Sequence, residues 1–421
     1  MFKLFANAWK VEDVRKKILY TLMILAVVRL GCHIAIPGID FVAVQQNINA
    51  YSTGTLYSLI AGGYNSNWSI FAMGIGPYIT ASIIMQLLTV AIPKLEQLSK
   101  EGQEGRKKLG IYTRYLTVVL STIQAIGITR SYSSMFVADS MVLYIASVIS
   151  LVAGSVFIMW LAEQITAKGI SNGSSMIIFV NIISNLPAGI QSIVYFAQGG
   201  EVMIGIVKIV VMLAILLLDV IFIVFLHDGE RRIPVQYSSK MLGRNAAGGR
   251  SSYMPVKVNT AGVISIIFAI SLLQFPQQIS MFFNTGATMQ KVISVLSMTH
   301  PVGAALYVVL IFLFSYFYVS IVINPNEIAE NMKKNGGFVP GIRPGQPTSA
   351  YITRVVNKVT FFGAVFYAVI AFVPIVLQWI LGINVGFGGT TLVIVVGVCL
   401  DIVKNIESQL LMRHYKGFLN K

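Results

Sequence analysis

The feature that most constrains this chain is a series of apolar runs long enough to cross a lipid bilayer. A helix needs about 20 apolar residues to span the hydrocarbon core, and runs near this length recur throughout the 421 residues. They lie near residues 18–36, 70–91, 112–129, 141–162, 174–194, 203–226, 260–281, 302–323, 356–379 and 386–403. The sequence therefore predicts an all-α integral membrane protein with about ten transmembrane helices.

Composition excludes a soluble globular protein. Charged residues make up only 11% of the chain, against about 25% in ordinary globular domains. The mean hydropathy of +0.75 leaves too few polar side chains to cover a soluble surface. The two cysteines, Cys32 and Cys399, lie far apart in apolar runs, so no disulfide framework is expected.

The net charge of +15 is concentrated on one side of the predicted spans. If the N-terminus is cytoplasmic, most of the 31 Lys and Arg residues precede span one, follow even-numbered spans or lie in the C-terminal tail. Cytoplasmic segments carry such an excess, so we expect both termini in the cytoplasm. The exceptions are Arg29, Arg130, Lys208 and Lys291.

The predicted spans divide near residue 200 into two sets of five. Because five is odd, the second set enters the membrane with the opposite orientation, as in an inverted repeat with a pathway between its halves. We expect an N-terminal half, residues 1–200, and a C-terminal half, residues 201–421, in a pseudo-symmetric five-plus-five arrangement around a central pore. The most polar connections, 227–258 and 324–351, are expected to be cytoplasmic.

Catalytic and cofactor signatures are missing from the sequence. It contains no GxxxxGK[ST] segment for a nucleotide and no HExxH or Cys/His cluster for a metal. The four histidines are scattered. We therefore expect no enzyme activity, no catalytic residues, no metal and no cofactor.

A short apolar segment, residues 54–64, precedes the second span. At about 1.5 Å per residue it is far too short to cross a bilayer. Glycines at Gly54, Gly62 and Gly63 permit sharp entry and exit. The residues alone leave two interpretations open: an outer re-entrant loop, or a movable plug folded back into a funnel.

Several segments, taken in order, resemble the SecY family, the channel subunits of the bacterial protein-secretion translocon. Together they cover nearly the whole chain, and the ordered set is more specific than any single motif. The segments are IPGID (36–40), FAMGIGPYITASIIMQLLTV (71–90), EGQEGRKKLGIYTRY (101–115), WLAEQITAKGISNGSSMIIF (160–179), ERRIPVQY (230–237), MPVKVNTAGVISIIFA (254–269), NPNEIAENMKKNGGFVPGIRPG (324–345) and FGGTTLVIVV (387–396).

The resemblance implies a channel that passes unfolded secretory polypeptides and releases apolar segments into the membrane lipid. Residues 54–67 correspond to the family's plug, with Leu56, Ser58, Leu59, Ile60, Gly62 and Gly63 as its candidate residues. The family's apolar pore ring maps onto Ile75, Ile79, Ile178, Ile267 and Ile394. Two polar residues lie on helices that flank the family's lateral gate, and a latch between them is a hypothesis: Gln86 and Asn259.

The same resemblance implies partners for the two polar loops. In the family these loops receive the SecA motor ATPase and the ribosome, while SecE braces the two halves and SecG lies at the periphery. Topology alone explains part of the basic charge. Our candidate docking residues are Arg231, Arg232, Arg244 and Arg343. The expected location is the bacterial plasma membrane.

Two other functions stay open at this point. An ion-coupled secondary transporter also fits an inverted repeat, but it should place carboxylates or broken polar helices at the midplane, where this chain offers isoleucines. A receptor or scaffold for ribosomes or other membrane proteins is supported only by the basic loops. The deeply placed Asp219 receives no partner and no role from the sequence.

Overall fold

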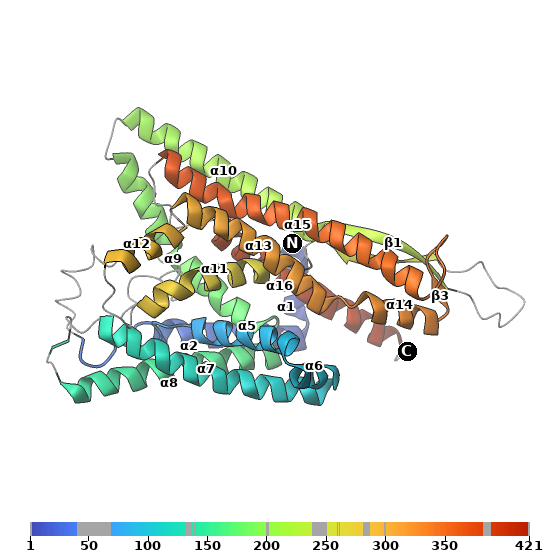
Figure 1. Ribbon diagram of the computed structural model, residues 1–421, viewed down its shortest axis with the longest axis horizontal. Coiled ribbons are helices and arrows are strands. Elements are labelled where there is room, and N and C mark those ends of the chain that lie inside the picture. Colours follow the sequence, from blue (N-terminus) through green and yellow to red (C-terminus); the bar gives the residue numbers. More distant parts are fainter. Residues whose placement is uncertain are drawn as a thin grey trace, which may run out of the picture.

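Long helices lying side by side make up most of the molecule, and a small three-stranded sheet lies at one end (Figure 1). The computed structural model describes residues 2–39, 69–131, 136–137, 140–198, 202–237, 251–258, 260, 262–280, 287–298, 300–381 and 389–419. Every predicted apolar run coincides with a separate helix. These helices are α2 (Glu12–Gly31), α5 (Gly76–Ala91), α7 (Gln103–Ser131), α8 (Met141–Lys168), α9 (Gly173–Gln198), α10 (Val202–Asp228), α11 (Gly262–Ser280), α13 (Pro301–Val322), α15 (Gln346–Leu381) and α16 (Gly389–Leu419).

Several of these helices are long and apolar enough to cross a membrane. Among the described residues, 4 helical stretches pass this test alone: Gln103–Arg130, Met141–Lys168, Pro301–Lys334 and Gln346–Val373. A fifth passes if α5 and α6 (Pro93–Lys100) form one broken span. The membrane class is thus confirmed, whereas the count of ten spans stays a prediction.

The break between α5 and α6 follows from one proline. Pro93 occupies the first turn of α6, and the residue before it, Ile92, is extended with φ −109° and ψ 114°. A proline disfavours the helical conformation of the preceding residue, and its ring suits a helix start. The two helices therefore meet at a bend of 102°.

The remaining elements lie outside the predicted spans. They are α1 (Phe2–Lys10), α12 (Ala287–Leu296), α14 (Pro325–Lys334), β1 (Glu230–Tyr237), β2 (Ser251–Lys257) and β3 (Gly337–Phe338). Strand β1 pairs antiparallel with β2 along its length and with β3 at its end. Both polar loops of the sequence therefore contain strands of one sheet, which sequence reasoning did not predict.

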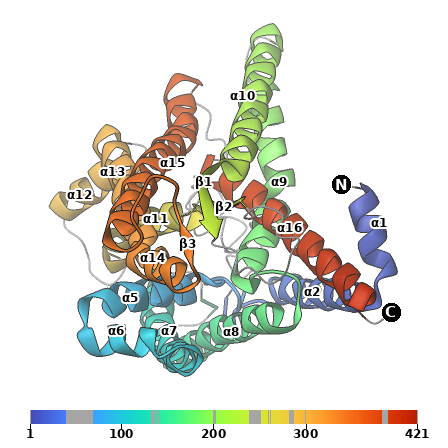
Figure 2. The ribbon, with the colours of Figure 1, turned by 90° about the vertical axis from the view of Figure 1, so that its right-hand side faces the viewer.

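Two apolar cores fill the space between the helices, and α16 contributes to both. The first joins α2, α8, α9, α16 and the turn before α5. The second joins α5, α10, α11, α13, α15 and α16. Ile394 and Val398 belong to the first core and Val393 to the second. Helix α16 thus lies between the two cores at its start, and in Figure 2 it runs from near the centre of the molecule to the edge beside α1.

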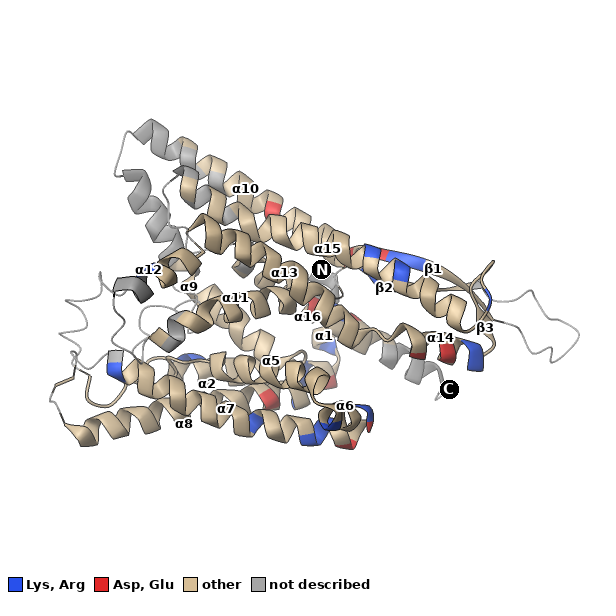
Figure 3. Cartoon of the chain, viewed as in Figure 1, with Lys and Arg blue, Asp and Glu red and all other residues tan. Residues whose placement is uncertain are grey.

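Basic side chains gather at one end of the molecule. Figure 3 shows Lys and Arg around α6, the strands β1 and β2, and α14, while the long apolar helices between the ends carry few charges. This distribution agrees with the charge asymmetry along the sequence. Which side of the membrane this end faces stays a prediction.

Candidate functional site

The five isoleucines of the predicted pore ring meet in one apolar cluster. Ile75, Ile178 and Ile394 are buried members of it, while Ile79 and Ile267 are partly buried and pack against it. They come from the start of α5, from α9, from α11 and from α16. The structure thus brings together side chains from four helices of both predicted halves. We call these five residues the isoleucine cluster.

This cluster is closed by packing. The exposed fractions of Ile75, Ile178 and Ile394 are 0%, 4% and 6%, so their apolar surfaces lie against other side chains. A fully buried isoleucine contributes about 1.5–3 kcal/mol relative to an exposed one. Apolar packing therefore holds these side chains together, which suits a constriction that opens and closes. The role of these residues as a pore seal stays a prediction.

A series of tight turns, residues 70–75, places Ile75 in the cluster. Gly74 adopts a positive φ of 53°, and its N–H donates to the carbonyl of Phe71 at 2.8 Å. The predicted span begins at residue 70, whereas α5 begins only at Gly76. The difference has a local cause, because the left-handed backbone at Gly74 interrupts the helix.

Two glycines let this turn lie against neighbouring helices. A Cβ on Gly31 of α2 would overlap the ring of Phe71, and one on Gly154 of α8 would overlap the carbonyl oxygen of Ile70. The Phe71 ring also stacks on Phe157 with centroids 6.1 Å apart. Close approach of backbone and ring thus fixes the position from which α5 starts.

The candidate plug residues lie outside the described part of the chain. This holds for the whole segment 54–67, including Leu56, Ser58, Leu59, Ile60, Gly62 and Gly63. The choice between a plug and an outer loop therefore rests on the sequence and the resemblance.

The predicted polar latch at the gate is only half described. The side-chain amide of Gln86 lies 3.5 Å from the hydroxyl of Ser82 on the same helix, and Asn259 lies outside the described residues. Helix α5 reaches the second half of the chain through apolar residues instead, because Ile79 and Ile83 pack in the second core. Sequence reasoning missed Ile83, although it lies one turn after Ile79.

The two polar loops form one folded unit at the charged end, which we call the charged lobe (residues 230–237, 251–258 and 323–352). Its sheet has the order β2-β1-β3, so the two loops meet at β1. A separate apolar core lies beneath it. The buried residues of this core are Ile233, Val235, Val256, Val319, Met332, Val339, Ile352 and Val356.

The charged lobe carries three of the four candidate docking arginines on its surface. Arg231 and Arg232 lie in β1 and Arg343 in the turn before α15, and all three are exposed. Arg232 donates from Nε to Glu230 Oε1 at 2.6 Å, and this hydrogen bond raises the pKa of its guanidinium. Arg244 lies outside the described residues.

A polar cluster links the ends of α10 and α16, and sequence reasoning missed it. Lys404 Nζ lies 2.8 Å from Asp228 Oδ1 and 3.1 Å from His227 Nδ1. His227 Nε2 lies 3.5 Å from Asp401 Oδ1. The Lys404 hydrogen bond, helped by its charge and by His227, lowers the pKa of Asp228. The cluster ties the helix that leads into β1 to the helix that carries Ile394.

Asp219 is the buried carboxyl of α10. It is 8% exposed, and its Oδ2 has no hydrogen-bond partner among the described residues. Ionisable groups inside spans are costly and are often functional. The described contacts do not connect Asp219 to the isoleucine cluster, so it receives no role here.

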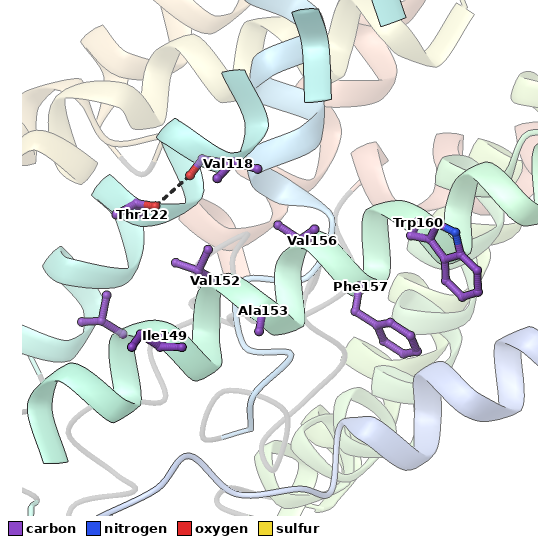
Figure 4. Close-up of a pocket in the computed structure, with 9 residues that line it drawn as sticks. Val118, Thr122, Ile149, Val152, Ala153, Val156, Phe157 and Trp160 are labelled. Atoms are coloured by element: carbon purple, nitrogen blue, oxygen red, sulfur yellow. Dashed lines mark hydrogen bonds between the residues drawn. The ribbon is translucent and has the colours of Figure 1, made fainter. Parts of the chain in front are cut away.

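A surface groove of about 780 Å³ lies between α7 and α8 (Figure 4). Eight of its nine lining residues are apolar; they include Val118, Ile149, Val152, Phe157 and Trp160. Thr122, the remaining one, donates its hydroxyl proton to the carbonyl of Val118. Nothing in this lining offers catalytic chemistry, and the groove lies apart from the residues of the isoleucine cluster. Among the described residues, no three His, Cys, Asp or Glu side chains come together as metal ligands either.

A family model described as SecY matches residues 69–403. The chain belongs to the SecY family. Two relatives named Protein translocase subunit SecY align over 100% of both chains: that of Halalkalibacterium halodurans is 43% identical and that of Streptomyces griseus 45% identical.

Solved structures share the same fold. One described as the structure of a protein conducting channel has a TM-score of 0.65 at 18% identity and covers 94% of this chain and 91% of its own. A SecY structure described by a plug domain that stabilises its closed state has a TM-score of 0.63 at 19% identity, with the same coverage. Canine Sec61 in a ribosome-channel complex has 0.62 at 18%, again with this coverage.

Membership of the SecY family decides between the functions left open by the sequence. The predicted helical channel fold and the predicted function, a protein-conducting channel subunit of the translocase, are confirmed. The transporter alternative is not favoured. The relatives are translocase subunits and channels, which is consistent with the expectation that the chain is not an enzyme.

Proposed function

We propose that this chain forms the pore of a plasma-membrane translocon, in which the isoleucine cluster is the seal and residues 54–67 are the plug. The observation that carries the proposal is the meeting of Ile75, Ile79, Ile178, Ile267 and Ile394 from four helices. Apolar β-branched side chains offer an unfolded polypeptide no hydrogen-bonding preference. A narrow apolar constriction also resists water and ions by dewetting.

Sideways release of apolar segments requires a seam that parts. Helix α5 packs closely along α7, and α11 along α13. The two pairs meet in the second core, where Ile79 and Ile83 of α5 pack with residues of α11 and α13. Apolar side chains separate without leaving unpaired polar groups in lipid, so a gate between α5–α7 and α11–α13 needs no polar latch to close.

The channel takes its driving force and its support from partners. We propose that SecA and the ribosome dock on the charged lobe, through Arg231, Arg232, Arg244 and Arg343. SecE braces the halves and SecG lies at the periphery. The positive charge of the lobe supports a cytoplasmic position for this end and for both chain termini. Ribosome-bound Sec61 among the structural neighbours supports the ribosome as a partner.

Reconstitution tests this function. Proteoliposomes that contain the chain with SecE and SecG should protect an unfolded secretory precursor from external protease only when SecA and ATP are added. Liposomes without the chain are the control. Precursor that stays fully digestible, or solute uptake driven by an ion gradient without SecA, would contradict the proposal.

A further inference from the structure

One face of the β1–β2 hairpin presents an arginine that is held in place from two directions. Along β1, Ile233 and Val235 are buried, so the alternation of a strand puts Glu230 and Arg232 on the opposite, outer face. Tyr253 of β2 shares this face, because it pairs with Pro234. The face therefore combines residues from both strands of the hairpin.

Arg232 is oriented by its two neighbours on this face. Its Nε donates to Glu230 Oε1 at 2.6 Å, and its Cζ lies 4.8 Å from the centroid of the Tyr253 ring. A guanidinium has five N–H donors in a planar fork, and Glu230 occupies the Nε side. Among the described residues no group occupies the terminal nitrogens, and the Arg232 side chain is 63% exposed.

We propose that Glu230 and Tyr253 are positioning residues, which hold the Arg232 fork ready for a carboxylate on a docking protein. This inference rests on the proposed docking role of the charged lobe and specifies its chemistry. A pre-oriented fork loses less conformational freedom when it binds a planar anion, and a carboxylate matches its bidentate geometry.

The outer face fits a protein segment better than a nucleic acid. Its basic side chains within the described strands are Arg232 and Lys257, and Glu230 lies opposite Lys257. Proteins that bind nucleic acid tightly neutralise several phosphates, about 6–10 in strong cases. Here Tyr253, 54% exposed, and two exposed prolines, Pro234 and Pro255, surround a single fork. Such a surface suits an acidic segment with apolar neighbours.

Arg231 provides a matched control within the same strand. It is also exposed, but it lies on the face that carries Ile233 and Val235 and pairs with Val256. Among the described residues, no aromatic ring or carboxylate lies against Arg231. A lysine keeps the charge and loses the fork, so Arg232→Lys should weaken docking more than Arg231→Lys.

The test measures binding of purified SecA to the full chain in nanodiscs. Tyr253→Leu should weaken binding about two- to five-fold, since exposed cation–π contacts are of this size, and Tyr253→Phe should leave it unchanged. In an Arg232→Ala background, Tyr253→Leu should have no further effect, because the tyrosine acts through the arginine. Unfolding temperatures of the variants report whether the lobe stays folded.

Three results would overturn the inference. Equal effects of Tyr253→Leu with and without Arg232 would make Tyr253 a packing residue. If ribosomal RNA displaced SecA and its binding depended on Tyr253 in the same way, the ligand of Arg232 would be a phosphate and not a carboxylate. Normal SecA binding by both Arg232→Lys and Tyr253→Leu would refute a role for the positioned Arg232 guanidinium, but SecA could still dock elsewhere on the charged lobe. If SecA did not bind the parent chain, the proposed docking of SecA on this lobe would itself be wrong.

Discussion

Truncation of one isoleucine in the cluster should open the resting channel to ions. Ile178→Ala removes three carbon atoms from a side chain that is 4% exposed. At about 0.8 kcal/mol per buried CH₂, the closed arrangement loses about 2 kcal/mol. Every 1.4 kcal/mol is a factor of ten. If Ile178 leaves the cluster on opening, the open population should rise roughly 30-fold.

Planar-bilayer recording of the purified channel, without SecA or precursor, measures this population as conductance. Ile178→Val removes one CH₂ and should raise conductance only about four-fold. Ile158→Ala is the matched control: Ile158 belongs to the same core, is 1% exposed and comes from α8, outside the predicted ring. Its truncation should destabilise the fold without widening the constriction.

Two outcomes would refute the reasoning. Unchanged conductance in Ile178→Ala, and in the variant with glycine at all five positions of the isoleucine cluster, would show that these side chains do not seal the pore. A comparable rise in Ile158→Ala would show that leak reports general loosening of the first core. If the five isoleucines form a ring, conductance should rise when one of them is truncated and should not rise when another buried residue of the same core is truncated.

Three further predictions concern the lobe, the plug and the helix ends. Charge reversal at Arg231 or Arg343 should weaken SecA or ribosome binding in a salt-sensitive way, since exposed charges are screened; binding that is equally tight at all salt concentrations in parent and variants would contradict this. A cysteine at Ser58 should crosslink to outer loops mainly when a precursor is engaged, and a plug locked to the pore wall should block translocation; transport at the parent rate would make residues 54–64 an ordinary loop. Because the pKa of Asp228 is lowered, its bond to Lys404 stabilises the fold above the unfolded-state pKa and is lost as the pH falls through the folded-state pKa. Lys404→Met should therefore cost about 0.2–1 kcal/mol at neutral pH, since the pair is exposed, and should flatten the acid side of the unfolding-temperature profile; a profile that superimposes on the parent's would contradict it.

Local features of the sequence are sufficient for the membrane class and the helices. In lipid, backbone polar groups must be satisfied internally, so an apolar run of sufficient length becomes a helix whatever its neighbours are. Breaks are also local: Pro93 bends the chain after α5, and Gly74 delays the start of that helix to Gly76. The placement of Lys and Arg likewise follows from the sequence.

The strands were harder to predict than the helices. Apolar alternation at Ile233 and Val235 is visible in the sequence, but Pro234 and Pro255 argue against a strand inside a sheet. The structure resolves this conflict, because β3 pairs with β1 only at Gln236 and Tyr237. Within the described part of the chain, Pro234 therefore has a partner strand only on the β2 side. On its other side no described strand needs the N–H that proline lacks.

Contacts between distant segments were decided by the tertiary structure. The resemblance identified the five isoleucines as candidates, but only the packing of α5, α9, α11 and α16 places them in one closed cluster. Hairpin register sets Tyr253 beneath Arg232, and the approach of α10 to α16 brings Lys404 to Asp228. Helix formation depends on each segment's own composition, whereas these contacts depend on how many side chains pack at once, and a pattern along one segment does not contain that information.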